Sequence, residues 1–283
     1  MRTLVKYRGG KSREISEFRR FIPEHYDRYI EPFFGGGAVF FELEPERAII
    51  NDVNEKLMNF YTEVRDSYAQ LRAELGELQL IYEENQAIYA REKALHPDDR
   101  VENMNEELYY RIRSMFNNQI DREYMEGTIY YFVNKTAYSG MIRYNRQGEY
   151  NVPFGRYVHF NTRIITREHS QLLQRAELFN VDYENIFEMV HDEDFMFLDP
   201  PYDCVFNDYG NVDMLNGFDE EQHRRLANNF RNLPCRAMMV IGRTALTEEL
   251  YGDMIRYQYP KRYAVNIRNR FNAEAMHIVV TNY

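Results

Sequence analysis

Short apolar runs that alternate with helical patterns constrain the fold of this chain more than any other feature. An amphipathic helix repeats its apolar residues every three to four positions, whereas a buried strand reads as a continuous run of roughly four to eight apolar residues. Seven segments are candidate strands, at 28–33, 48–52, 177–181, 195–198, 236–241, 256–265 and 277–281. Strands that alternate with helices are typical of a parallel sheet covered on both faces. The sequence therefore predicts an α/β fold.

A long helical segment interrupts this alternation. It begins at about Glu55 and contains few glycines or prolines until Gly127. The segment is too long for one crossover connection and too polar for the core of a sheet. We therefore expect one domain built from residues 1–57 and 161–283, into which residues 58–160 are inserted as a second, mainly helical domain.

The arginines are unevenly distributed. The formal net charge is −10 at pH 7, which argues against a generic nucleic-acid binder. Residues 141–167 nevertheless carry five arginines and one acid, and residues 255–272 carry four arginines, one lysine and no acid. These segments are either solvated surface or a local basic face that meets phosphates. Within the first of them, Gln147-Gly148 predicts the turn of a hairpin.

Other classes of protein are disfavoured by composition. No apolar run approaches the roughly 20 residues that span a bilayer, and the amino-terminal residues lack the apolar core of a secretory signal. The two cysteines, Cys204 and Cys235, imply neither a disulfide framework nor a zinc cluster. We expect a cytoplasmic protein with no metal site.

Glycines stand between the first strand and its helix. In "YIEPFFGGGAVFFEL", Gly35, Gly36 and Gly37 let the backbone approach a ligand closely, although a tight connection alone would also explain them. Asp52 ends the next strand and is positioned for the hydroxyls of a ribose. The nucleoside could belong to S-adenosylmethionine or to a dinucleotide. Lys11, in "KYRGGK", either pairs with a carboxylate, such as that at the methionine end of S-adenosylmethionine, or is a surface lysine.

The fourth strand ends in an acid and two prolines. "FMFLDPPYDC" spans 195–204, and neither proline has an N–H for the sheet ladder. The motif is either a strand terminator or a site in which Asp199 and the Pro200 carbonyl are held rigidly.

Six ordered motifs give the chain a specific resemblance. "KYRGGK", "YIEPFFGGGAVFFEL", "INDVN", "GEYNVPFGRY", "FLDPPY" and "IVVTNY" follow the order of the Dam-type DNA adenine methyltransferase family, the N6-adenine-specific D12 class. The chain resembles this family over nearly its whole length. The resemblance implies a Rossmann-like core that depends on S-adenosylmethionine, and an inserted target-recognition domain with a DNA-reading hairpin at about 138–157.

The resemblance also assigns roles to individual residues. It implies a catalytic motif of Asp199, Pro200, Pro201 and Tyr202. It implies cofactor contacts by Tyr7, Lys11, Gly35, Gly36, Gly37, Asp52, Asp182, Tyr183 and Asp199. It implies DNA contacts by Tyr138, Ser139, Arg143, Asn145, Pro153 and Tyr157. The segments "DCVFNDYGNVDML", "IGRT" and "NIRNRFNAEAM" depart from the family's pattern and bear on the recognised sequence.

The chemistry of this family would explain the motif at 199–202. An acceptor on each N–H of the adenine amino group would favour a tetrahedral nitrogen with its lone pair toward the methyl donor. Tyr202 would stack on a base swung out of the duplex. Double-stranded DNA is the expected substrate, GATC the leading site, and a monomer or weak dimer the expected state, with a cognate restriction endonuclease as partner if the chain belongs to such a pair. A catalytically silent DNA-binding regulator is the alternative function, and an N4-cytosine enzyme would more usually carry Ser in place of Asp199.

Overall fold

Two compact units make up the part of the chain that the structure describes. The computed structural model describes residues 1–7, 9–140, 142–202, 218–261 and 275–283. The first unit contains the described residues of Met1–Gly10 and Asn54–Gln174, and the second contains Lys11–Val53 and the described residues from Arg175 to Tyr283. The unit boundaries differ from the predicted domain boundaries after 57 and 160. The division into a catalytic and a recognition domain therefore stays a prediction.

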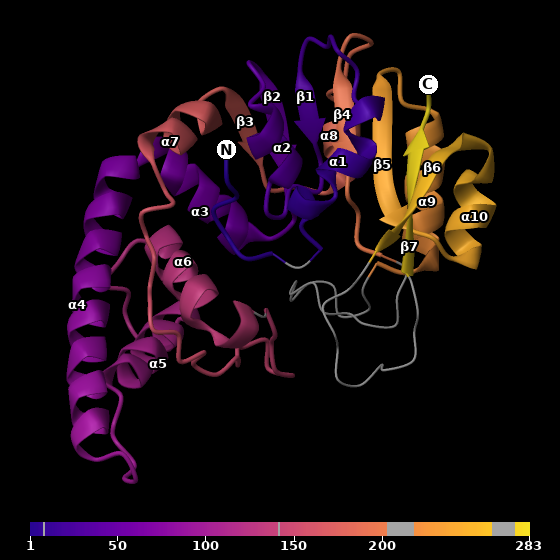
Figure 1. Ribbon diagram of the computed structural model, residues 1–283. Coiled ribbons are helices and arrows are strands. Elements are labelled where there is room, and N and C mark those ends of the chain that lie inside the picture. The colour runs from indigo at the N-terminus through magenta and orange to yellow at the C-terminus, as the bar shows by residue number, and fades with distance from the viewer. Residues whose placement is uncertain (8, 141, 203–217, 262–274) are drawn as a thin grey trace. The chain divides into compact units, whose positions relative to one another are not determined.

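The second unit is built on one mixed sheet (Figure 1). Among the described residues the sheet has seven strands in the order β3-β2-β1-β4-β5-β7-β6. Their bounds are β1 Tyr29–Glu31, β2 Ala48–Asn51, β3 Ala176–Phe179, β4 Phe195–Leu198, β5 Arg236–Gly242, β6 Ile255–Lys261 and β7 Ala275–Thr281. The first five strands run parallel, and β7 runs antiparallel to both β5 and β6. The predicted α/β fold and its seven strands are confirmed, except that the end of the sixth predicted run lies outside the described residues.

The central strands are buried throughout because helices cover both faces of the sheet. Every residue of β1, β2 and β4 is buried, whereas in the edge strand β6 exposed positions alternate with half-buried or buried ones. Continuous apolar runs are what a parallel sheet covered on both faces requires. On one face a core that includes Ile49, Met196 and Met239 packs against α8 Tyr183–Phe187, α9 Glu220–Arg231 and α10 Ala245–Tyr251.

Aromatic side chains fill the other face of the sheet. Phe18 of α1 Ile15–Phe18 stacks on Phe197, with ring centroids 5.6 Å apart. Phe40 of α2 Ala38–Leu43 lies against Tyr29, at 6.4 Å. Four single 3₁₀ turns complete the described helical elements, at η1 Lys11–Arg13, η2 Arg19–Phe21, η3 Tyr138–Gly140 and η4 Gly252–Met254.

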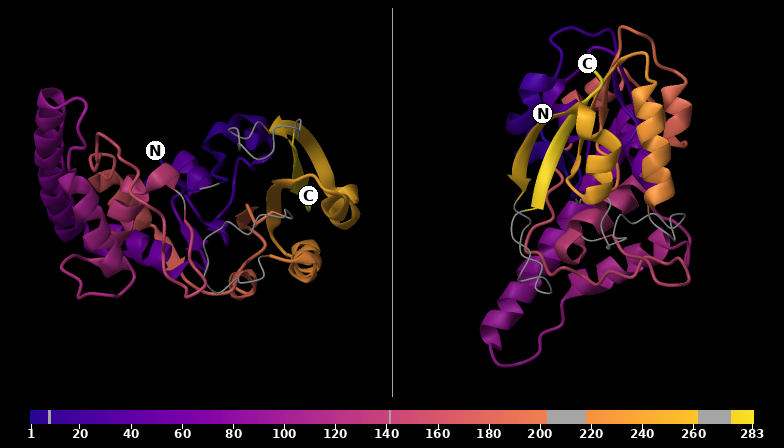
Figure 2. Two further views of the ribbon diagram at one scale, coloured as in Figure 1. Left: turned by 90° about the horizontal axis from the view of Figure 1, so that it is seen from below. Right: turned by 90° about the vertical axis from the view of Figure 1, so that its right-hand side faces the viewer.

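The first unit is helical, and its described residues contribute no strand to the sheet. Its helices are α3 Glu55–Asp66, α4 Tyr68–Leu95, α5 Met104–Phe116, α6 Glu126–Thr136 and α7 Arg167–Leu173. Figure 2 shows α4 as a long helix, and its buried residues Leu71, Leu75, Leu78 and Tyr82 recur at helical spacing. Within the described residues, no helix is both long and apolar enough to cross a membrane.

The predicted hairpin turn is confirmed. Tyr144 and Tyr150 form an antiparallel bridge, and the Asn145 N–H donates to the Glu149 carbonyl at 2.8 Å. Gly148 has φ of +78°, a left-handed conformation that glycine adopts without strain. The Asn145 side chain accepts from the N–H groups of Gln147 and Glu149 at 3.0 and 2.9 Å. Asn145 therefore organises the turn from its centre.

Candidate active site

Three acids lie where strands of the parallel sheet end. Glu31 is the last residue of β1, Asp52 follows β2, and Asp199 follows β4. The order of the strands reverses direction between β1 and β4, which are neighbours in the sheet. In open α/β sheets the crevice at the carboxyl ends of the strands, at such a reversal, is where ligands bind. Glu31 and Asp199 flank this position.

The glycine turn after β1 is tied to Asp52. The Gly35 N–H donates to Asp52 Oδ2 at 2.8 Å. Gly35 and Gly37 have φ of +48° and +64°, and a Cβ at Gly37 would stand 2.5 Å from the Phe34 ring. Only glycine fits there, because both the left-handed backbone and the adjacent ring exclude a side chain. Gly36, between them, is buried.

Asn51 joins the ends of three strands and was missed by the sequence analysis. Its amide donates to the carbonyls of Pro32 and Val181 at 3.0 and 3.1 Å, and its oxygen accepts from the Val181 N–H at 2.9 Å. Asn180 extends the pattern by donating to the Asp52 carbonyl at 2.8 Å. A buried Asn beside the acid in "INDVN" was the available signal. These bonds fix the loops around Asp52.

Lys11 is buried against the motif at residues 199–202. Its side chain is 1% exposed, and Nζ lies 2.5 Å from Asp199 Oδ1. The same ammonium lies 5.0 Å from the centroid of the Tyr202 ring, within cation–π range. The interpretation of Lys11 as a surface lysine is therefore wrong. The carboxylate that Lys11 pairs with is that of Asp199, and pairing with the methionine end of a bound cofactor stays a prediction.

Burial and neighbouring charges shift the pKa values of the acids at the carboxyl ends of the strands. Burial raises the pKa of Asp199, and the charge and hydrogen bond of Lys11 oppose that rise. Burial also raises the pKa of Glu31 well above its usual range, and the charges of Asp199 and Asp52 add to the rise. The Tyr29 hydroxyl donates to Glu31 Oε2 at 2.7 Å. Acids with raised pKa values gathered in a crevice are typical of a functional site.

Asp182 and Tyr183 lie beside Arg225 of α9. Asp182 Oδ1 accepts from the Glu184 N–H at 2.9 Å and so caps α8, and Asp182 Oδ2 lies 3.1 Å from Arg225 Nη2. Tyr183 is buried, packs on the Phe33 ring at 5.2 Å and accepts from Arg225 Nε at 3.0 Å. Both residues make structural contacts, and their cofactor role stays a prediction.

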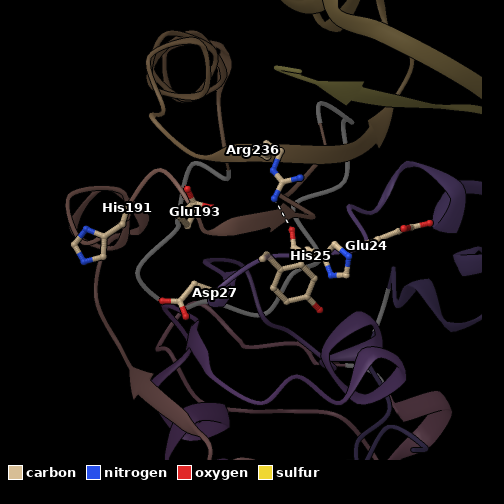
Figure 3. Close-up of a pocket in the computed structure, with 7 residues that line it drawn as sticks. Glu24, His25, Asp27, His191, Glu193 and Arg236 are labelled. Carbon is tan, nitrogen blue, oxygen red and sulfur yellow. Dashed lines mark hydrogen bonds between the residues drawn. The ribbon is translucent and has the colours of Figure 1, made fainter.

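A pocket lies at the opposite ends of the strands. It has a volume of about 660 Å³ and is lined by Glu24, His25, Tyr26, Asp27, His191, Glu193 and Arg236. Figure 3 shows these side chains around the hollow, with Arg236 donating to the backbone of His25. The lining segments precede β1, β4 and β5, so the pocket is at the amino ends of the strands and apart from Asp199.

Comparison with known proteins identifies the family. The profile of the D12 class N6 adenine-specific DNA methyltransferases matches residues 7–265. This chain belongs to that family. It is 34% identical to the Type II methyltransferase M.CviBI of Paramecium bursaria Chlorella virus NC1A over the full length of both chains.

Two further relatives come from cellular organisms. The methyltransferase is 31% identical to the Type II methyltransferase M.MjaIII of Methanocaldococcus jannaschii, over 90% of this chain and 88% of that one. It is 25% identical to the retron Ec67 DNA adenine methylase of Escherichia coli, over 100% of this chain and 92% of that one. The predicted family is confirmed, and with it an enzyme class, the adenine-specific DNA methyltransferases.

In the first unit of the methyltransferase, part of the predicted DNA-reading segment is exposed to solvent. Tyr138 is 55% exposed although it is a large aromatic residue. Ser139 is exposed and has φ of +58°, an unusual backbone conformation for a non-glycine residue. Arg143 is exposed, and its Nε donates to Asn151 Oδ1 at 2.8 Å across the hairpin. This bond ties the Arg143 guanidinium to the opposite arm of the hairpin.

The remaining predicted DNA contacts have more structural surroundings. Pro153 is exposed, and its carbonyl accepts from the Tyr138 N–H at 2.9 Å. The Lys6 ammonium lies 4.0 Å from the centroid of the half-buried Tyr157 ring. Burial, followed by the charge of Lys6, lowers the pKa of Lys135 to about 8.

Tyr7, a predicted cofactor contact, is half-buried and belongs to the first unit.

Proposed function

We propose that this methyltransferase transfers a methyl group from S-adenosylmethionine to the N6 amino group of an adenine in a short double-stranded DNA site. The observation that carries the proposal is the position of Asp199. It follows β4 at the strand-order reversal, is followed by two prolines, and is held by the buried Lys11 ammonium at 2.5 Å. A carboxylate fixed in this way is pre-positioned for a substrate.

The residues at the strand ends fit S-adenosylmethionine. The Asp52 carboxylate lies beside a glycine turn at the end of the second strand, the combination that holds a ribose in nucleoside-binding α/β folds. A family of methyltransferases requires a methyl donor. When bound, S-adenosylmethionine supplies an electrophilic methyl group attached to a positively charged sulfur. Gly35, Gly36, Gly37 and Asp52 would hold its nucleoside end.

The chemistry at the amino group follows from Asp199 and Pro200. The amino nitrogen of adenine is a weak nucleophile because its lone pair is delocalised into the ring. The Asp199 carboxylate and the Pro200 carbonyl would each accept one N–H, which favours a tetrahedral nitrogen. Burial raises the pKa of Asp199, and Lys11 opposes the rise. The carboxylate is therefore a better hydrogen-bond acceptor than a solvated aspartate.

Tyr202 would receive the target base. An adenine inside a duplex is inaccessible to Asp199, so the base must leave the stack. The Tyr202 ring lies next to the Lys11 ammonium and two residues beyond Pro200. An aromatic face at this position would stack the extruded base, and such stacking contributes about 1–3 kcal/mol per base.

We propose that the first unit recognises the DNA sequence. Arg143 is exposed on the hairpin, and arginine is the side chain best suited to a bidentate contact with guanine. GATC is the leading candidate site, and another short adenine-containing site is the alternative. Two relatives are named Type II methyltransferases, which supports a modification enzyme of a restriction-modification pair.

Methyl transfer from radiolabelled S-adenosylmethionine to plasmid DNA tests the activity. We expect label in duplex DNA, and methylation-sensitive sequencing of that DNA then identifies the modified site without assuming GATC. DNA binding without transfer of label would overturn the proposed activity and favour a silent DNA-binding regulator.

Arg143→Ala and Arg146→Ala form a matched pair that tests recognition. Both arginines are exposed on the same hairpin, so the variants lose the same charge. We expect Arg143→Ala to lower discrimination at one base pair by about 1–3 kcal/mol, and Arg146→Ala to weaken all duplexes alike. Equal ratios of cognate to mismatched methylation in Arg143→Ala and wild type would exclude Arg143 as the reader.

A further inference from the structure

A buried acid stands behind the catalytic motif. Glu14 is 5% exposed and follows Lys11 by one helical turn, with its N–H donating to the Lys11 carbonyl at 2.7 Å. Three side chains donate to its carboxylate, from strands β6 and β7. They are the Tyr259 hydroxyl at 2.9 Å, the Lys261 ammonium, and His277 Nδ1 at 2.7 Å. We call these four residues the Glu14 cluster.

The Glu14 carboxylate is ionised at neutral pH. Burial alone raises the pKa of Glu14, but the hydrogen bonds of His277 and Lys261 and the charge of Lys11 outweigh that effect and bring it to about 2. An ionised carboxylate can only accept hydrogen bonds. The N–H of this contact is therefore on His277 Nδ1, which donates a hydrogen bond to Glu14. The imidazole orientation is fixed by this bond.

The Glu14 cluster reaches the catalytic motif through His277. The fully buried His277 ring meets the Tyr202 ring edge-on, with centroids 5.1 Å apart and planes at 88°. The Lys11 ammonium lies 5.0 Å from the centroid of the same ring. The Tyr202 ring also packs against Gly242 at the end of β5, where a Cβ built on the glycine would lie 3.6 Å from the ring. Tyr202 is thus confined on several sides.

We propose that Glu14 and His277 are positioning residues for methyl transfer. Glu14 fixes the imidazole of His277, His277 fixes the Tyr202 ring, and the backbone bond between Glu14 and Lys11 holds the lysine that pairs with Asp199. The inference rests on the proposed function and adds to it two residues that lie outside the 199–202 motif. Neither residue touches the reacting atoms in this account.

Stability alone is a weak explanation for such a cluster. Removing two or more charges from water carries a penalty that often cancels the attraction between them, and apolar residues of similar size are frequently as stable. Conformational specificity is the advantage that a fully bonded polar group offers. The cluster gives the Tyr202 ring one orientation before substrate arrives.

Three variants test the inference. Glu14→Gln keeps the size of the side chain and removes its charge. His277→Asn keeps a donor near the position of Nδ1 and removes the ring edge that meets Tyr202. Asp194→Asn is the matched control, because Asp194 is a fully buried, ion-paired acid of the same unit. Asp194 lies at the other end of β4.

The first measurement is single-turnover methylation of the cognate duplex, with S-adenosylmethionine and DNA affinities measured separately. We expect Glu14→Gln and His277→Asn to lower the rate constant about tenfold, less than the roughly hundredfold loss that a 1 Å misplacement of a reacting group can cause, while both affinities stay within twofold. Asp194→Asn should keep the wild-type rate constant per folded molecule. If Glu14→Gln does not fold, His277→Asn carries the test.

The second measurement reports on base stacking without methyl transfer. A duplex with 2-aminopurine at the target position is bound by each variant in the Tyr202 and the Tyr202→Ala backgrounds. We expect Glu14→Gln to change the fluorescence of the complex only when Tyr202 is present, because coupled residues are not additive. Equal changes in both backgrounds, or a wild-type rate and signal in both variants, would overturn the inference. Failure of the wild-type chain to transfer methyl would instead overturn the proposed function.

Discussion

Two acids flank strand β4 and differ in how they are paired. Asp194 precedes the strand and forms two bonds with one arginine, from Arg28 Nε at 3.0 Å and Nη2 at 2.6 Å. The His191 N–H adds a third bond at 2.7 Å. Asp199 follows the strand, and its ion-pair partner among the described residues is the ammonium of Lys11, at 2.5 Å.

The electrostatics of the two ends differ in the same way. The hydrogen bonds that Arg28 donates to Asp194 raise the pKa of Arg28, so that pair is mutually stabilised. At the other end burial raises the pKa of both Asp199 and Glu31, and the charges of Asp199 and Asp52 add to the rise at Glu31. A closed, bidentate pair suits a structural role. An acid with few bonds and a raised pKa suits a group that must exchange partners with a substrate.

The largest expected effect is on catalysis at the carboxyl end. Asp199→Asn is nearly isosteric but replaces one acceptor oxygen with a donor. We expect single-turnover methylation to fall about a thousandfold, within the range for a positioned acid or base. Circular dichroism should show an unchanged fold. Near-normal turnover would mean that the two ends of β4 do not differ in function.

Asp194→Asn should have the opposite effect, a loss of stability without a loss of activity. Breaking a buried pair leaves the Arg28 charge uncompensated, so we expect the free energy of unfolding to fall by about 3 kcal/mol. Urea titration measures this loss. Activity per folded molecule should equal that of wild type, and a loss of activity at full folding would remove the distinction between the two acids.

The Glu14 cluster predicts a pH-dependent difference in stability. The folded pKa of Glu14 is about 2 against an ordinary value of 4.5. Its contribution is therefore complete above pH 4.5 and is lost as the pH falls toward 2. We expect Glu14→Gln to be less stable than wild type at pH 7 by on the order of 2–3 kcal/mol. The gap should narrow below pH 4.5 in urea titrations, and a pH-independent gap would contradict an ionised Glu14.

The smallest expected effect concerns the cofactor. Asp52→Ala should weaken S-adenosylmethionine binding by about 1–3 kcal/mol, because charge-assisted hydrogen bonds are lost. Calorimetry measures the affinity. Asp182→Ala is the comparison variant, since its visible contacts are a helix cap and an ion pair with Arg225. Equal weakening by both variants would place Asp182 in the cofactor site with Asp52.

Local patterns in the sequence predicted the parts of the site that local physics determines. The apolar run of β4 and the prolines after it located Asp199, and the three glycines located the turn that Asp52 holds. The roles of Asp182 and Tyr183 depended on the family resemblance, and the sequence held no sign of their contacts with Arg225 of α9.

Contacts between distant residues were not predictable in the same way. Lys11 and Asp199 are 188 positions apart, and Glu14 and His277 are 263 apart. No spacing rule links such pairs, because the sheet order alone brings them together. Glu14 looked like one of many surface acids in a chain with 45 of them.

The place of β7 in the sheet has a consequence for folding during synthesis. β7 is made after the six other described strands, yet it lies between β5 and β6 and pairs with both. The strand that carries Tyr259 and Lys261 therefore has no sheet neighbour among the described strands until β7 has left the ribosome. Domains acquire their long-range pairings late. Asp199 can thus be made before the imidazole of His277 that meets the Tyr202 ring, which arrives only with β7, and a nascent chain holds an incomplete candidate site until β7 pairs.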